Sequence, residues 1–258
     1  CEDKLWALIR DDYYNYLKAH GLKKLPRSEY GEYLERAGVA HTEVPWEHSW
    51  DRYTGREARR FIDTYGKDGP FAMMVGFPGP HDPYDPASDF PHTYQPEDMP
   101  APIPASPSHG DSLREIRLQR RRTGMGMDLG PYVEDVVRDV RAHYAGLVKQ
   151  IDHEVGEIID TLRRNGLLEN TAIVLATDHG DHLGDHGIEG KATFYESAAH
   201  IPLLVSAPGS EKGSTCADLV ELRDVTATML ALTGCDLPAY MDAQPLPGLG
   251  LNGPSPRR

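Results

Sequence analysis

The chain has 258 residues, of which 39% are hydrophobic, and it carries 27 basic and 40 acidic side chains for a formal net charge of −13. This length suits one large domain or slightly more, and the acidic balance argues against nucleic acid or an anionic membrane as a general partner. No apolar run approaches the roughly 20 residues of a membrane span. The three cysteines, Cys1, Cys216 and Cys235, form neither a Cys-x-x-Cys pair nor a zinc-finger spacing, so no disulfide framework is indicated.

Apolar side chains at three- and four-residue spacing predict amphipathic helices over residues 4–20, 56–65 and 131–165. A glycine closes each of these stretches, as is typical of helix ends. We expect residues 22–53 to form loop. Residues 111–123 are strongly basic, which indicates a solvated helix face or, alternatively, the rim of an anionic-substrate site or a subunit contact in a homo-oligomer.

Apolar runs at residues 71–77, 172–176 and 201–206 predict buried strands. A further helix is expected over residues 225–232, capped by Asp224. Helices that alternate with buried strands indicate an α/β fold in which helices sandwich a largely parallel sheet. In such folds ligands bind at the carboxyl ends of the strands, so the loops that follow these strands are candidate sites.

The first of these loops is rich in proline. Ten of the chain's 21 prolines lie within residues 78–107, where they favour an extended, semi-rigid segment. His81 lies in this segment directly after the strand predicted over 71–77, within a Pro-His-Asp-Pro element. A single histidine is usually structural or solvated, but this position at a strand end makes His81 a candidate site residue. Asp82 and Asp85 are expected to cap turns.

The loop after the strand predicted over 172–176 holds the densest group of metal-binding side-chain types, in the run Thr-Asp-His-Gly-Asp-His-Leu-Gly-Asp-His-Gly. Four imidazoles and three carboxylates fall within 23 residues: His179, His182, His186, His200, Asp178, Asp181 and Asp185. For any single histidine, a solvated polar loop is the simpler interpretation. The adjacent pair Asp178 and His179 at the strand end fits a metal site. Its mixed ligands suit Mn²⁺ or Zn²⁺, and Ca²⁺ or Mg²⁺ are compatible if other carboxylates join.

Together with the segments that follow it, this run resembles a known family. The following segments are Gly190-Lys191, Phe194-Tyr195-Glu196 and the apolar run at 201–205. The whole pattern resembles the second half of type I sulfatases of the alkaline phosphatase superfamily. Its Asp-His form, with a lysine thirteen residues after the aspartate, is similar to choline-sulfatases and phosphonate monoester hydrolases. The resemblance implies an α/β catalytic domain of the alkaline phosphatase type over residues 1–245, incomplete at both ends, with residues 246–258 as an irregular tail.

The resemblance also implies metal-dependent hydrolysis of a sulfate ester, either a small molecule or a saccharide. Asp178 and His179 would bind the divalent cation, expected to be Ca²⁺ or Mn²⁺, with Mg²⁺ or Zn²⁺ compatible. His81 and Lys191 would be catalytic and would contact the substrate, together with His186. A phosphonate or phosphate ester hydrolase on the same fold is the alternative, and a non-catalytic, metal-stabilised sulfatase relic is a third interpretation.

Sulfatases use a formylglycine nucleophile made from the cysteine of a Cys-x-Pro-x-Arg motif, and none of the three cysteines lies in that motif. The family's early metal-binding aspartates and its Lys-x-His segment are not recognisable either. Lys18-Ala19-His20 matches Lys-x-His by letters alone, in the last turn of a predicted helix, where solvated side chains are expected. We therefore expect this chain to be the internal-to-C-terminal part of a sulfatase, inactive on its own, with the formylglycine in the part that precedes it.

Overall fold

The computed structural model describes residues 10–24, 38–91, 94–104, 134–188, 190–191, 193–249 and 251. The chain divides into two compact units. The first comprises Cys1–Asn165 with Asp181–Lys191, and the second comprises Gly166–Gly180 with Ala192–Arg258. The predicted basic segment at 111–123 and Cys1 lie outside the described residues. No helix in the described part of the chain is long and apolar enough to cross a membrane.

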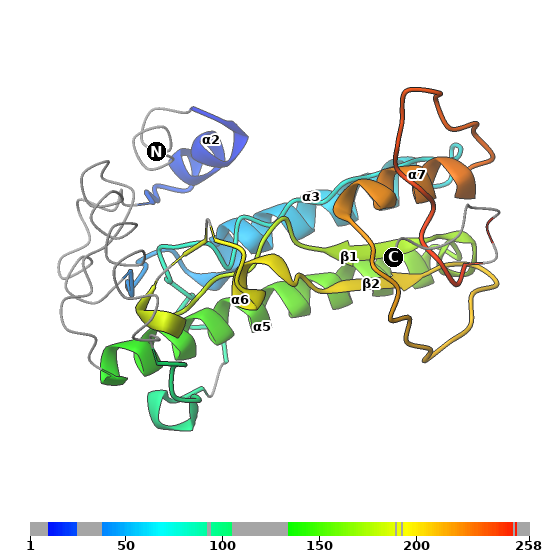
Figure 1. The fold of residues 1–258 in the computed structure, drawn as a ribbon. Coiled ribbons are helices and arrows are strands. Elements are labelled where there is room, and N and C mark those ends of the chain that lie inside the picture. Colours follow the sequence, from blue (N-terminus) through cyan, green and yellow to red (C-terminus); the bar gives the residue numbers. More distant parts are fainter. Residues whose placement is uncertain are drawn as a thin grey trace. The chain divides into compact units, whose positions relative to one another are not determined.

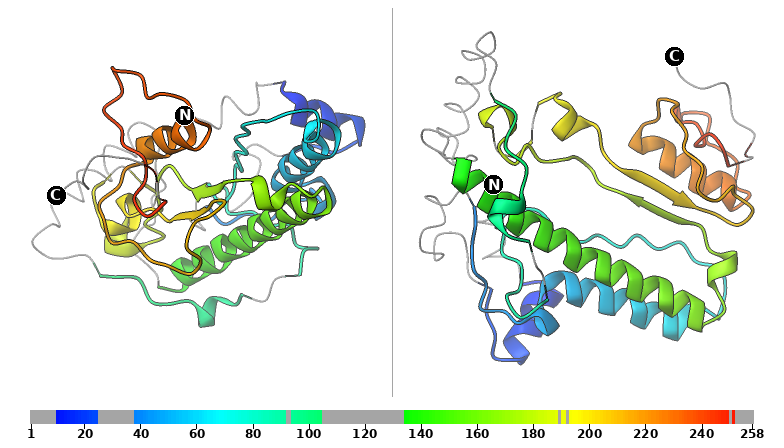
Figure 2. Two further views of the ribbon diagram at one scale, coloured as in Figure 1. Left: turned by 90° about the vertical axis from the view of Figure 1, so that its right-hand side faces the viewer. Right: turned by 90° about the horizontal axis from the view of Figure 1, so that it is seen from below.

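Two helices form the frame of the first unit, α3 (Trp50–Tyr65) and α5 (Glu134–Arg164), and they lie side by side (Figures 1 and 2). Both confirm helices predicted from apolar spacing. α3 begins six residues earlier than predicted, so the expectation of loop at this point is wrong. The reason is a cap, because the hydroxyl of Ser49 accepts a hydrogen bond from the amide of Arg52 at 3.3 Å and starts the helix there.

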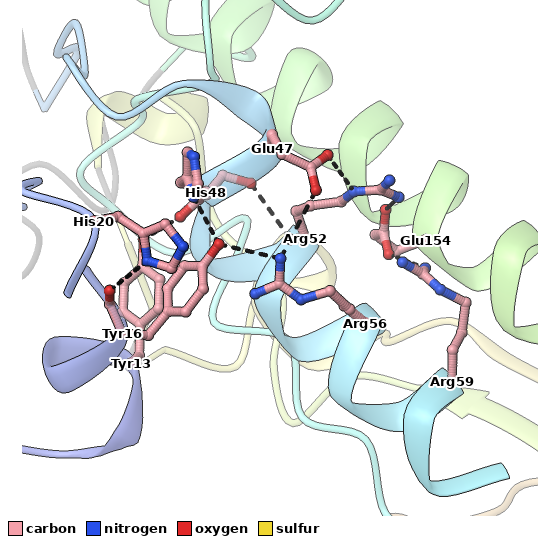
Figure 3. Close-up of polar contacts among 10 residues, drawn as sticks. Tyr13, Tyr16, His20, Glu47, His48, Arg52, Arg56, Arg59 and Glu154 are labelled. Carbon is pink, nitrogen blue, oxygen red and sulfur yellow. Dashed lines mark hydrogen bonds and ion pairs between the residues drawn. The ribbon is translucent and has the colours of Figure 1, made fainter. Parts of the chain in front are cut away.

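A buried carboxylate and two half-buried arginines join α3 to α5 (Figure 3). Glu154 of α5 is fully buried and accepts hydrogen bonds from Arg52, at 2.8 Å, and from Arg59. Gly55 of α3 leaves room for this carboxylate, since a Cβ there would lie 2.1 Å from a Glu154 oxygen. A buried carboxylate is costly unless it is paired, so this contact fixes how the two helices meet.

The helix α2 (Asp12–Ala19) packs on the start of α3 through aromatic rings. Tyr13 stacks on Trp50 with ring centroids 5.0 Å apart. The hydroxyl of Tyr16 lies 2.6 Å from Nδ1 of His48 (Figure 3), which belongs to a short 3₁₀ helix just before α3. α2 confirms the first predicted helix as far as that helix lies within the described residues.

The second unit contains two strands, β1 (Ile173–Ala176) and β2 (Leu203–Ser206), at the positions predicted for strands. They pair in antiparallel orientation, with Ala176 opposite Leu203, so the prediction of a largely parallel sheet is wrong for the described residues. β2 therefore begins beside Ala176, the residue at which β1 ends. A parallel pair needs a crossover back to the other end, usually through a long helix. The described part of this connection has no helix longer than the four residues of α6 (Glu196–Ala199).

A strand was also predicted at residues 71–77, in the first unit, and this prediction is wrong. They form no strand ladder with another described segment. Their side chains alternate between half-buried and exposed positions, and Met74 is 94% exposed. The apolar run thus keeps the two-residue period of an extended chain, but a strand also needs a neighbour that pairs with its amides and carbonyls.

The helix α7 (Leu222–Leu232) of the second unit begins three residues before the predicted start. Its N-cap is Glu221 and not Asp224, because the two side chains form a reciprocal capping box. The Asp224 carboxylate accepts the amide of Glu221 at 2.8 Å and, with its other oxygen, the amide of Gln244 at 3.0 Å. Asp224 therefore caps the helix from within its first turn and also ties down the chain that follows α7.

Candidate active site

The loop that carries His81 is held by α3 at Gly79. The buried carboxylate of Asp51 accepts a hydrogen bond from the amide of Gly79 at 3.1 Å. A Cβ at Gly79 would lie 2.6 Å from an Asp51 oxygen, so the close approach requires glycine. Burial raises the pKa of Asp51 to about 6, although the Gly79 hydrogen bond and the charge of Lys24 lower it. α3 thus fixes the loop two residues before His81.

His81 is oriented by its neighbour Asp82 and meets Lys191. Its Nδ1 lies 2.8 Å from the carbonyl oxygen and 3.0 Å from a carboxylate oxygen of Asp82. Both oxygens can only accept, so Nδ1 carries the proton and Nε2 presents a lone pair. This Nε2 accepts a hydrogen bond from Nζ of Lys191 at 2.5 Å. The side-chain hydrogen bond with Asp82 raises the pKa of His81, against the opposing effects of burial and of the Lys191 charge.

Lys191 follows a loop whose two described ends, at His182 and Gly190, meet. The amide of His182 donates to the carbonyl of Gly190 at 2.8 Å. His182 and Ile188 are almost fully buried, with 1% and 2% of their surface exposed. A loop that is closed at its base and has buried side chains is characteristic of packed Ω-loops, so Lys191 extends from a fixed point of the chain.

Asp181 closes the same loop with its side chain. One carboxylate oxygen accepts the amides of Leu183 at 2.9 Å and Gly190 at 3.1 Å. The other oxygen accepts the hydroxyl of Tyr84, three residues after His81, at 3.0 Å. Both carboxylate oxygens therefore bind protein donors, which makes Asp181 part of the loop structure.

His186 and Asp185 lie in a short 3₁₀ helix, Asp185–Gly187, of this loop. Arg141 of α5 donates to the Asp185 carboxylate at 2.6 Å, which ties the loop to the helix. The backbone of His186 is left-handed, with a φ of 57°, and its amide donates to the carbonyl of Ile103 at 2.7 Å. The expected role of His186 in substrate binding stays a prediction.

In the second unit, Asp178 and His179 follow β1 directly. Nδ1 of His179 donates to the carbonyl of Gly180 at 2.8 Å, so Nε2 presents its lone pair, 3.5 Å from a carboxylate oxygen of Asp178. Gly180 fits tightly, since a Cβ there would lie 2.1 Å from the carbonyl oxygen of Ser197, and its amide donates to Ala198 at 2.9 Å. α6 thereby fixes the turn that presents the pair.

The pair Asp178 and His179 fits two positions of a divalent-cation site. Metal-binding imidazoles are commonly oriented by a hydrogen bond from the second ring nitrogen to a carbonyl, as here, and the Asp178 side chain is 78% exposed. No group of three or more His, Cys, Asp or Glu side chains that could hold a metal ion occurs within the described ranges. The pair therefore supplies part of a ligand set. It belongs to the second unit and the His81–Lys191 contact to the first, so the expected convergence of all four residues stays a prediction.

The residues that position this site do not stand out in the sequence. Asp181 and Asp185 belong there to the group of possible metal ligands, although both are bound by donors of the protein itself. The sequence pattern could have indicated Asp51. It lies at helical spacing with Gly55, Ala58 and Ile62, on the buried face of α3. An acidic side chain on such a face is rarely buried without a specific partner.

Comparison with known proteins defines the class. The family model for sulfatases matches residues 8–235. The chain belongs to the sulfatase family, within the alkaline phosphatase superfamily, as the motifs indicated. A solved phosphonate monoester hydrolase from Silicibacter pomeroyi is similar in structure, with a TM-score of 0.73 and 24% sequence identity, over 91% of this chain and 48% of that chain. The fold is therefore of the alkaline phosphatase and sulfatase type.

Two relatives show how much of a sulfatase this chain covers. An arylsulfatase from Clostridium perfringens (strain 13 / Type A) is 29% identical over 197 residues, which are 75% of this chain and 40% of that protein. A choline-sulfatase from Rhizobium meliloti (strain 1021) is 34% identical over 169 residues, which are 65% of this chain and 32% of that protein. The chain thus spans less than half the length of these curated relatives.

Proposed function

We propose that the whole protein hydrolyses a sulfate ester and that His81 and Lys191 bind the sulfate group. The observation that carries this proposal is the 2.5 Å contact between Nζ of Lys191 and Nε2 of His81, which lie 110 positions apart in the chain. An ammonium and an imidazole nitrogen that meet at one point form a site for an oxyanion. Membership of the sulfatase family supports the same chemistry.

Each of these side chains has a distinct task. Lys191 supplies a compact positive charge for the non-bridging oxygens as the ester bond breaks. Nδ1 of His81 is hydrogen-bonded to Asp82, so Nε2 is the ring nitrogen that is left to face the ligand. Because its pKa is raised, His81 is more readily protonated, and a protonated Nε2 donates to an ester oxygen or delivers a proton to the leaving oxygen.

Asp178 and His179 would hold the divalent cation. Their carboxylate oxygen and imidazole nitrogen suit Ca²⁺ or Mn²⁺, with Mg²⁺ or Zn²⁺ compatible. When bound, such an ion supplies Lewis-acid catalysis and a template for the oxyanion. We assign residues 1–245 to the catalytic domain, and we expect the formylglycine nucleophile and the remaining ligands outside this chain. On that basis the 258-residue chain alone has no turnover.

Hydrolysis of a phosphonate or phosphate ester is the second candidate. A phosphonate monoester carries the same single negative charge as a sulfate monoester and is also tetrahedral, with two non-bridging oxygens in place of three. Lys191, and His81 once its Nε2 is protonated, can donate to either group, and the Asp178–His179 pair suits the same cations for both. The Asp-His form of the motif, with its lysine thirteen residues on, fits both activities as well.

The test is turnover of the whole protein with an aryl sulfate and an aryl phosphonate monoester that share one leaving group. We expect faster hydrolysis of the sulfate, and a loss of about 10²- to 10³-fold in kcat/KM in Lys191→Ala, as for removal of one oxyanion donor. Lys67→Ala, which changes an exposed lysine of the same unit, is the control and should match the wild type. Faster phosphonate hydrolysis would favour the second candidate, and full activity of Lys191→Ala would contradict both.

A further inference from the structure

The loops that carry His81 and Lys191 are joined at a second point as well. The hydroxyl of Tyr84 donates to the carboxylate of Asp181 at 3.0 Å. We propose that this Tyr84–Asp181 hydrogen bond is the positioning link that brings Lys191 to His81 and sets the affinity of the site for the anionic group of the substrate. The inference rests on the proposed function, because it assigns Tyr84 and Asp181 as positioning residues of that site.

Tyr84 is the fixed end of the link. It is 2% exposed and packs in the core of the first unit against residues that include Val140. Its amide donates to the carbonyl of Gly38 at 2.8 Å, and its own carbonyl accepts the amide of Ala40 at 3.1 Å. It follows His81 by three residues, so its hydroxyl is held in register with the loop that presents His81.

Asp181 is the end of the link that determines the position of Lys191. One of its oxygens holds both ends of the Lys191 loop, through the amides of Leu183 and Gly190. Gly190 directly precedes Lys191, so a displacement of Asp181 displaces the point from which the lysine side chain extends. The second oxygen binds Tyr84, and a carboxylate has acceptor sites for both contacts.

Loss of the Tyr84 hydroxyl should separate the two loops without dismantling either. The Asp181 bonds to Leu183 and Gly190 remain within the loop, and Arg141 still holds Asp185. Lys191 then has to be ordered by the ligand itself, at the expense of the rotamer freedom of a long side chain. Hydrogen bonds to charged groups correspond to about 10- to 100-fold in an equilibrium constant. We expect the affinity for inorganic sulfate to fall by about 10-fold.

The control removes a neighbouring hydroxyl. Tyr144 of α5 lies beside Tyr84, with ring centroids 6.1 Å apart, and burial and the charge of Asp181 raise its pKa to about 12. It thus lies in the same electrostatic environment, yet the structure shows no hydrogen bond from Tyr144 to Asp181, both of which are described. Tyr144→Phe therefore makes the same chemical change without cutting the link.

The experiment is calorimetric titration of inorganic sulfate into the chain for the wild type, Tyr84→Phe, Tyr144→Phe, Lys191→Ala and the double variant Tyr84→Phe/Lys191→Ala, with the melting temperature of each. We expect Tyr84→Phe to weaken binding about 10-fold and Tyr144→Phe to leave it unchanged. In the Lys191→Ala background, Tyr84→Phe should have no further effect, because it acts through the lysine. A merely structural role would instead lower affinity in both backgrounds.

The outcomes separate the two claims. If Lys191→Ala binds sulfate as the wild type does, the proposed function fails, and the inference fails with it. If Lys191→Ala weakens binding but Tyr84→Phe matches Tyr144→Phe, or if its effect adds to that of Lys191→Ala, the inference alone is overturned. Should Tyr84→Phe melt far below the wild type, the same titrations are made below its melting temperature, where a sulfate affinity equal to that of Tyr144→Phe still overturns the inference.

Discussion

Replacement of Asp51 by asparagine is expected to remove a pH-dependent loss of stability. Asp51 is 6% exposed, and its pKa is raised from 3.8 to about 6, mainly by burial. Among the charged groups that face it, Lys24 lowers the pKa, whereas Asp85 and Glu154 raise it. Asparagine keeps a carbonyl oxygen for the amide of Gly79, so the contact that holds the His81 loop should survive.

The direction of the pH effect on stability depends on whether the folded or the unfolded state binds the Asp51 proton more tightly. The folded protein binds the Asp51 proton up to about pH 6, whereas the unfolded chain releases it near pH 3.8. Between these values the folded state binds more protons, so the free energy of unfolding falls as the pH rises. The difference between a pKa of 3.8 and one of about 6 corresponds to about 3 kcal/mol, at about 1.4 kcal/mol for each pH unit. This loss develops above pH 4 and is complete by about pH 7.

Denaturant unfolding of the wild type and of Asp51→Asn, at intervals from pH 4 to pH 7.5, measures this effect. His81 adds a decline of the same sign, because a raised histidine pKa stabilises the fold at low pH and this stabilisation is lost as the pH rises. The informative quantity is therefore the difference between the two proteins, which should change by about 2–3 kcal/mol over this range. Asp68→Asn, at an exposed position, should follow the wild type. A difference that stays constant with pH would refute this reasoning.

Three further changes test the packing and the metal pair. Gly180→Ala should lower stability by about 1–3 kcal/mol in thermal unfolding, since the new Cβ would lie 2.1 Å from a backbone carbonyl oxygen of α6; at Gly156 nothing lies within 4 Å, so Gly156→Ala is the control. Glu154→Gln should reduce the free energy of unfolding by about 3–5 kcal/mol, because two arginines of α3 lose their buried carboxylate. Asp178→Ala should weaken Mn²⁺ binding, followed by electron paramagnetic resonance of the free ion, because it removes the charged ligand.

Each of these expectations has a contrary result. Equal melting temperatures for Gly180→Ala and the wild type would mean that the turn after β1 is not packed against α6. A loss below about 1 kcal/mol in Glu154→Gln, the size typical of exposed pairs, would mean that the carboxylate is solvated. Unchanged Mn²⁺ affinity in Asp178→Ala would remove Asp178 from the ligand set.

The helices could be predicted from the sequence because their apolar period is local. α5 carries the period over 31 residues, and the position of its buried face follows from that spacing. The two strands were also predicted in place, but their antiparallel pairing was not, because direction depends on how the connection returns. The prediction at 71–77 failed for a related reason, since a run of apolar residues does not specify a hydrogen-bonding neighbour.

In the candidate site, too, local features could be predicted from the sequence and tertiary contacts could not. His81 and Lys191 were predicted to lie in one site. The structure places Nε2 of His81 2.5 Å from Nζ of Lys191, and their roles in binding and catalysis stay predictions. The sequence favoured Asp178 over Asp181 as a metal ligand because Asp178 lies at the strand end beside His179, but it did not indicate the structural role of Asp181. The distinction arises from loop closure, since Asp181 is satisfied by amides and by Tyr84, whereas the Asp178 side chain is 78% exposed.

The central claim is that His81 and Lys191 bind one oxyanion together, and titration of inorganic sulfate into the chain tests it most directly. Wild type should bind sulfate, and His81→Ala and Lys191→Ala should each weaken binding by about 10-fold or more, as expected for loss of a charge-assisted donor. The double variant should be less affected than the product of the two single effects, since the residues act as one site. Lys67→Ala should bind as the wild type does. Sulfate binding that is unchanged in both single variants would contradict the claim.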